Sequence, residues 1–184
     1  MKWSRVYLLV PVFVATAMIL SGVSASFAEE SKDAKIARAM SAAPERVSAE
    51  ATIVDVDGTV LREGSNGWTC MPGIMPGDEH PMCNDDVWMK LMKALGEEAD
   101  FQTDRVGVSY MLKGDAHVNN ADPADTKKDP GETWVQEGPH LMIIFPDRKS
   151  LEAFPDDPGA GGPYVMWKDT PYAHVMVPTG PRVK

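Results

Sequence analysis

The stretch that decides the fold is ATIVDVDGTVLREG, residues 51–64. Two runs rich in β-branched residues, 50–56 and 59–62, flank the dipeptide Asp57-Gly58. Asp-Gly between such runs is a strong signal for a two-residue hairpin turn, in which both turn residues adopt a positive φ. The stretch therefore predicts two antiparallel strands joined by a tight turn.

The segment DVDGT, residues 55–59, also resembles the nucleophile motif of haloacid dehalogenase-like hydrolases. The resemblance implies that Asp55 attacks phosphorus, that Asp57 acts as acid and base, and that magnesium lies between the carboxylates. Such a site also needs a parallel strand, a lysine and an acidic pair from later strands. After Val60 the chain runs into REGSNGWTC with no crossover helix, and Asp156-Asp157 lie in a Gly/Pro-rich loop. We favour the hairpin and keep an Asp-nucleophile phosphohydrolase as an alternative.

The rest of the chain predicts few helices and several short strands. Residues 31–43 favour a helix that Pro44 ends, and NDDVWMKLMKALGEE (84–98) favours a second, with Asn84 as N-cap and an apolar face. That face is formed by Trp88, Leu91, Met92 and Leu95. Strands are predicted at 106–112, 140–145, 164–167 and 173–178, and the polar segment 114–132 is predicted to be a long loop with no core to bury.

These elements predict an α+β fold with a mainly antiparallel sheet, one principal helix and long pinned loops. We divide the chain into a signal peptide (1–28), an N-terminal helical or mobile segment (29–48) and a single α+β domain (49–184).

The N-terminus is typical of a signal peptide. Lys2 and Arg5 precede an apolar run at 6–20, and Ser26 and Ala28 are small residues at the positions that a signal peptidase reads. Cleavage is expected after Ala28, which gives a periplasmic or secreted product with no membrane span. The remaining chain has 16 basic and 27 acidic residues, a net charge of −11, so nucleic acid is not an expected partner.

Cys70 and Cys83 are the only cysteines of the sequence, and an oxidising compartment favours their pairing. We predict a structural disulfide that closes the segment CMPGIMPGDEHPMC, because this spacing differs from that of redox-active C-x-x-C motifs.

Two His-x-Met motifs are candidate copper ligands. His140 with Met142, and His174 with Met176, each place imidazole and thioether on one face of a predicted strand. These groups suit copper, and Trp134 or Trp167 could shield such a site. The alternative is that both methionines fill the core while each histidine makes a local hydrogen bond.

Other candidate ligand clusters are weaker. His80 is flanked by Met75 and Met82, and a loop rich in Asp and Asn begins at Asp115. This loop lacks the Gly and Glu of a calcium-binding EF-hand, so we interpret it as a solvated acidic loop.

Several stretches resemble a group of exported bacterial proteins without assigned function. They are NGWTCMPG, HPMCNDDVWM, VGVSYMLKG, GPHLMI and PYVMWKDTPYAHVMVP, which together span most of residues 52–178. The resemblance implies no known activity. His140 and His174 fall inside the matching stretches, which favours them as site candidates.

Three hypotheses follow. The first is a non-catalytic binding or structural module for a small ligand or an envelope partner, with the aromatic contact candidates Trp68, Tyr164, Trp167 and Tyr172. The second is a periplasmic copper-binding protein that uses His140, Met142, His174 and Met176. The third is the phosphohydrolase. We expect no cofactor under the first hypothesis, and copper is the cofactor of the second.

Overall fold

The computed structural model describes residues 30–182, and the predicted signal peptide lies outside them. The helical elements are α1 (Lys32–Met40), α2 (Glu45–Ser48), α3 (Asp86–Gly96), η1 (Arg148–Ala153) and η2 (Pro158–Ala160). The first strands are β1 (Thr52–Val54), β2 (Val60–Arg62), β3 (Thr69–Met71), β4 (Met82–Asn84) and β5 (Gly107–Met111). The later strands are β6 (Val118–Asn119), β7 (Trp134–Val135), β8 (His140–Ile144), β9 (Tyr164–Met166) and β10 (His174–Pro178).

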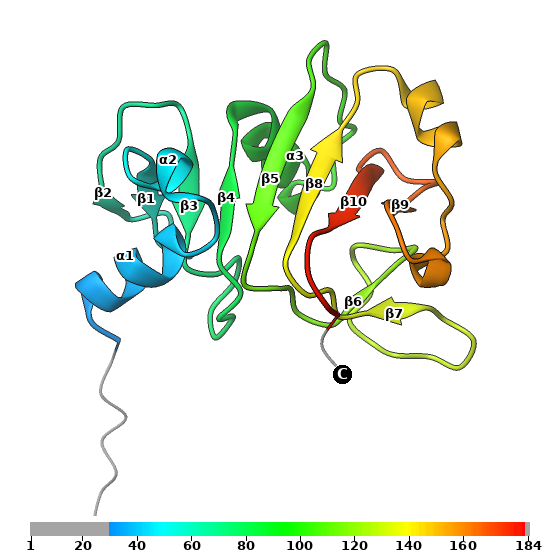
Figure 1. Ribbon diagram of the computed structural model, residues 1–184, viewed down its shortest axis with the longest axis horizontal. Coiled ribbons are helices and arrows are strands. Elements are labelled where there is room, and N and C mark those ends of the chain that lie inside the picture. Colours follow the sequence, from blue (N-terminus) through cyan, green and yellow to red (C-terminus); the bar gives the residue numbers. More distant parts are fainter. Residues whose placement is uncertain (1–29, 183–184) are drawn as a thin grey trace, which may run out of the picture.

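Eight strands form one sheet in the order β2-β1-β3-β4-β5-β8-β10-β9 (Figure 1). Six of its seven neighbouring pairs are antiparallel, and β1 with β3 is the parallel one. The predicted α+β class with a mainly antiparallel sheet is therefore confirmed. Among residues 30–182, no helix has the length and apolar character needed to cross a membrane.

The stretch at 51–64 forms an antiparallel hairpin, but its turn differs from the predicted one. The Asp55 amide donates to the Thr59 carbonyl, and the Gly58 amide donates to the Asp55 carbonyl. Gly58 has a φ of 85°, whereas Asp57 does not have a positive φ. The prediction of positive φ at both residues was wrong: residues 56–58 form a three-residue connection in which glycine alone takes the left-handed conformation.

α3 begins one residue later than predicted. Asp85, not Asn84, is the N-cap: one carboxylate oxygen accepts from the Trp88 amide at 2.8 Å and the other from the Val108 amide at 2.7 Å. Asn84 is the last residue of β4, and its amide oxygen accepts a hydrogen bond from the Ser109 hydroxyl. Asn84, which the sequence pattern assigned to the helix as its N-cap, therefore belongs to the sheet.

The two faces of the sheet have different covers. α3 packs its Trp88 and Leu91 against one face, in a core that takes in methionines of β4, β5, β8, β9 and β10. On the other face, α1 and α2 cover the β1–β4 side, and Leu151 of η1 packs on β9 and β10. Figure 1 shows α3 behind the sheet and α1 and α2 at its left end.

The polar segment 114–132 contains a short strand that the sequence did not indicate. β6 pairs with β7 in a separate two-stranded sheet, and Val118 packs against the α3-side core. The prediction that this segment has nothing to bury was wrong, because one apolar residue reaches the core between polar turns.

Candidate functional site

The two His-x-Met motifs lie on neighbouring antiparallel strands. Met142 of β8 is directly opposite Met176 of β10, and each histidine precedes its methionine by two positions. All four side chains are buried. The motifs therefore share the face that α3 covers, but the antiparallel register places His140 and His174 at opposite ends of the strand pair, four positions or about 13 Å apart. The four residues do not converge on a single ion.

Both histidines have the same hydrogen-bonding pattern. Nδ1 of His140 lies 2.7 Å from the Gly138 carbonyl oxygen, and Nδ1 of His174 lies 3.0 Å from the Tyr172 carbonyl oxygen. A carbonyl only accepts, so each Nδ1 carries the proton and donates it. Each Nε2 is buried and has no hydrogen-bond partner. An imidazole held in this way presents the Nε2 lone pair, the arrangement in which histidine binds metals.

Aromatic rings surround His174. Its ring centroid lies 5.1 Å from that of Trp88 and 5.0 Å from that of Trp167, with interplanar angles of 82° and 84°. Trp167 has a φ of 55° and donates from Nε1 to the Asn119 carbonyl at 2.9 Å. Burial lowers the pKa of His174 to about 4, so its imidazole is neutral at physiological pH.

His140 begins a row that contains methionines of the neighbouring strands. Met111 of β5 is its direct cross-strand partner on one side, and Pro178 of β10 is its partner on the other. The register of β4 and β5 pairs Cys83 with Tyr110, which puts Met82 beside Met111 on the same face. Met71 of β3 continues the row as the partner of Met82. Three methionines and one histidine thus follow one another across four strands.

Charged groups lie at the same end of the sheet. The Asp115 amide donates to the Glu137 carbonyl, which places the segment after β5 beside the segment before β8. Burial raises the pKa of the Asp115 carboxyl, and the neighbouring His140 acts in the opposite direction. Asp78 accepts hydrogen bonds from the His80 backbone at 3.0 Å and bonds to its ring at 2.7 Å. In residues 30–182, no three His, Cys, Asp or Glu side chains gather as a metal-binding group.

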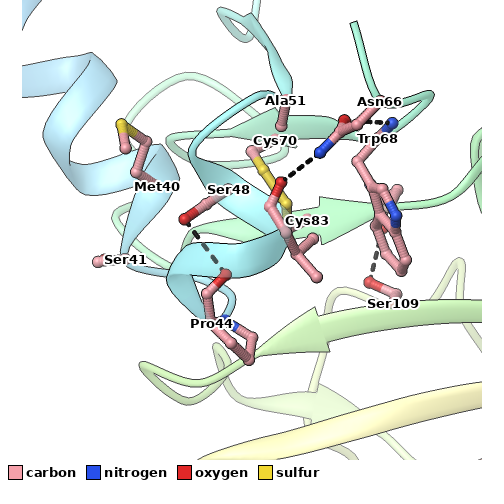
Figure 2. Close-up of a disulfide and its surroundings, with 12 residues drawn as sticks. Met40, Ser41, Pro44, Ser48, Ala51, Asn66, Trp68, Cys70, Cys83 and Ser109 are labelled. Carbon is pink, nitrogen blue, oxygen red and sulfur yellow. Dashed lines mark hydrogen bonds between the residues drawn. A yellow bond between two sulfur atoms is a disulfide. The ribbon is translucent and has the colours of Figure 1, made fainter. Parts of the chain in front are cut away.

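The predicted disulfide between Cys70 and Cys83 is present (Figure 2). The two cysteines are directly opposite each other on β3 and β4, and both are fully buried beneath α1 and α2. The loop 72–81 that they close is also held from within, because the Asp78 carboxylate accepts from the Ile74 amide at 2.9 Å. The disulfide lies inside a packed core, which is the environment expected of a structural disulfide.

The carboxylates of the DVDGT segment have local partners. Asp55 forms a 2.7 Å ion pair with Lys35 of α1, and its other oxygen accepts from the Val56 amide. Asp57 is exposed and accepts from the Thr59 amide at 2.8 Å. The two carboxylates therefore bind the first helix and the turn.

The four aromatic contact candidates do not form one pocket. Trp68 packs with Tyr110 on the α1 side of the sheet, with ring centroids 5.5 Å apart. Tyr164, Trp167 and Tyr172 belong to the core on the α3 side. A hollow of about 160 Å³ does open elsewhere, between Phe101, Phe145 and Arg148. The Arg148 guanidinium there already donates to main-chain carbonyls at 168, 170 and 171.

Comparisons with protein-family models, curated proteins and solved structures find no match to this chain. Sequence reasoning identified His140 but missed Met111 and Met82 as its neighbours. The alternation of residues within 106–112 and 81–83 indicates which face of its strand each methionine occupies. It identifies the neighbours of His140 only once the order of the strands in the sheet is known.

Proposed function

We propose that this protein is an exported, non-catalytic binding module whose ligand is a copper ion. One observation carries the proposal: the fully buried His140 directs its Nδ1 proton to the Gly138 carbonyl and leaves Nε2 without a partner on a methionine-rich face. A buried acceptor without a partner costs about 1–3 kcal/mol, and a bound ion would remove that cost.

The donor chemistry supports copper. Imidazole suits several transition metals, whereas thioether selects soft ions, Cu(I) above all. Met142 and Met176 lie between the two histidines, and Met111 lies opposite His140.

Several features support export. The first 28 residues have the pattern of a signal peptide, and a disulfide joins the two cysteines. An exported protein with this donor set would hold copper in the cell envelope. The proposed role corresponds to the second of the three hypotheses, a periplasmic copper-binding protein.

The test is an elemental analysis of mature protein purified from a periplasm that is supplied with copper, zinc, calcium and magnesium. We expect about one copper per chain, loss of copper in His140→Ala, and retention in the control His117→Ala, whose ring is exposed. Protein that carries no copper after gentle purification and takes up none when titrated with Cu(I) would overturn the proposal.

A further inference from the structure

The two buried imidazoles differ in what fills the space around them. His174 has an indole ring at about 5 Å on each of two sides, from α3 and from the residue after β9. Trp88 Nε1 is also buried without a partner, on a ring whose centroid lies 5.1 Å from that of His174. One buried water could serve both atoms, as buried waters commonly do. This environment is filled by aromatic rings and accounts for His174 without a metal.

Within residues 30–182, no aromatic ring pairs with His140 as the two indole rings pair with His174. The cross-strand neighbours of His140 are Met111, whose side chain is flexible, and Pro178. The Cβ atoms of His140 and Met111, as direct cross-strand partners, are expected about 5 Å apart, and that of Met82 lies one strand further, about 10 Å from His140. Met111 and Met82 are 2% and 4% exposed, and His140 is fully buried. Methionine has enough rotatable bonds to turn its sulfur toward a shared point between neighbouring strands.

Building on the copper-binding function proposed above, we propose that the ion is Cu(I) and that it is held by His140 Nε2 together with the thioethers of Met111 and Met82. This site excludes His174, and it includes two residues that the His-x-Met motifs do not contain. Two thioethers beside one neutral imidazole favour the monovalent ion over Cu(II) and Zn(II).

The disulfide supports this site structurally. Cys83 follows Met82, and Cys70 precedes Met71, so the bond between them fixes the register of β3 and β4 directly beside the methionine row. Ile74 of the disulfide-closed loop packs against the same core as Met82 and Met111. The loop 72–81 thus covers this end of the sheet, and it carries His80, which is partly exposed, and Met75, which is 58% exposed. These two side chains place an imidazole and a thioether on the solvent side of this loop.

The chain offers a matched pair of variants for the test. Met111 is the cross-strand partner of His140, and Met166 is the cross-strand partner of His174. Leucine conserves the volume of methionine and removes the sulfur, so the fold is expected to tolerate either change. We would measure Cu(I) affinity by competition with a chromogenic Cu(I) chelator, under anaerobic conditions with ascorbate, on the disulfide-bonded protein. Circular dichroism would verify the fold of each variant.

We expect Met111→Leu and Met82→Leu each to weaken Cu(I) binding by at least about 100-fold, because changes outside the ligand shell already cost about 10–100-fold. Met166→Leu is expected to leave the affinity within about threefold. X-ray absorption at the copper edge should show one nitrogen and two sulfur neighbours. Unchanged affinity in Met111→Leu and Met82→Leu would overturn this site while copper binding itself stands, and a loss in Met166→Leu would move the ion to His174. A wild-type protein that binds no Cu(I) would instead overturn the proposed function.

Discussion

The Tyr164 hydroxyl donates a 3.0 Å hydrogen bond to the Glu137 carboxylate, and both side chains are almost completely buried. The same carboxylate accepts from the guanidinium of Arg182, near the C-terminus. Burial, followed by the negative charge of Glu137, raises the pKa of the Tyr164 hydroxyl well above its ordinary value. A neutral phenol and a charged guanidinium thus stabilise one buried carboxylate, and they tie β9 and the C-terminal segment to the start of β8.

Tyr164→Phe is expected to lower the free energy of unfolding by about 2 kcal/mol, because a hydrogen bond to a buried charge is lost and its acceptor is left underpaired. Urea unfolding followed by circular dichroism would measure it. Tyr110→Phe, on the α1 side of the sheet, is the control. A Tyr164→Phe effect below about 0.5 kcal/mol would show that the hydroxyl does not stabilise Glu137.

His174 should make the protein less stable in mild acid. Its pKa is about 4 in the folded protein against 6.5 for an unperturbed histidine, so the unfolded chain binds the proton more tightly. The contribution of this pKa difference to the free energy of unfolding is fully present above pH 6.5, and it is lost as the pH falls from 6.5 toward 4. Between pH 7.5 and pH 5.0 the loss amounts to about 2 kcal/mol, from about 1.4 kcal/mol for each pKa unit.

The measurement is urea unfolding of the wild type and of His174→Gln at both pH values. Other groups titrate in both proteins, so the difference between the two pH dependences isolates His174. We expect the variant to lose about 2 kcal/mol less than the wild type over this interval. Parallel pH dependences would contradict a neutral, buried imidazole.

Removal of the disulfide should cost about 3 kcal/mol of unfolding free energy, the chain-entropy expectation for a loop of this length. Cys70→Ala with Cys83→Ala removes the cross-link and leaves no free thiol, since these are the only cysteines. The variant is compared with wild-type protein in oxidised and in reduced form. If oxidised wild type and the double variant unfold at the same urea concentration, the disulfide is not a stabilising staple.

Local patterns predicted most of the fold. The β-branched runs around Asp57-Gly58 indicated the hairpin, the apolar face of 84–98 indicated α3, and compartment chemistry indicated the disulfide. All three depend on residues close in sequence or on a single pair of cysteines. The N-cap of α3 was not predictable from local pattern. Asn84 was the predicted N-cap, but its side chain accepts a hydrogen bond from Ser109 on the next strand, and Asp85 caps the helix.

The candidate site was less predictable because it depends on strand order. Period-two alternation correctly placed His140 and Met142 on one face, and likewise His174 and Met176. It could not show that β8 lies between β5 and β10, which makes Met111 the neighbour of His140. Pairings between strands about 30 residues apart leave no local signal in a single sequence.

Gly138 lies where the C-terminal segment crosses the start of β8. A Cβ atom at this position would overlap the Pro181 carbonyl oxygen, so even alanine cannot fit unless the segment moves. Displacement of Pro181 would also pull the adjacent Arg182 away from Glu137. We therefore expect Gly138→Ala to lower the free energy of unfolding by about 1–3 kcal/mol, the usual cost of overpacking.

Gly162 is a matched control, because a Cβ there meets nothing within 4 Å and its φ is not positive. Gly162→Ala should leave stability unchanged within about 0.5 kcal/mol. Limited proteolysis with a basic-residue-specific protease separates local release from global loss: Gly138→Ala should be cut at Arg182 faster than the wild type at urea concentrations where both remain folded. Equal cleavage rates would mean that the backbone absorbs the added methyl group without releasing the C-terminal segment.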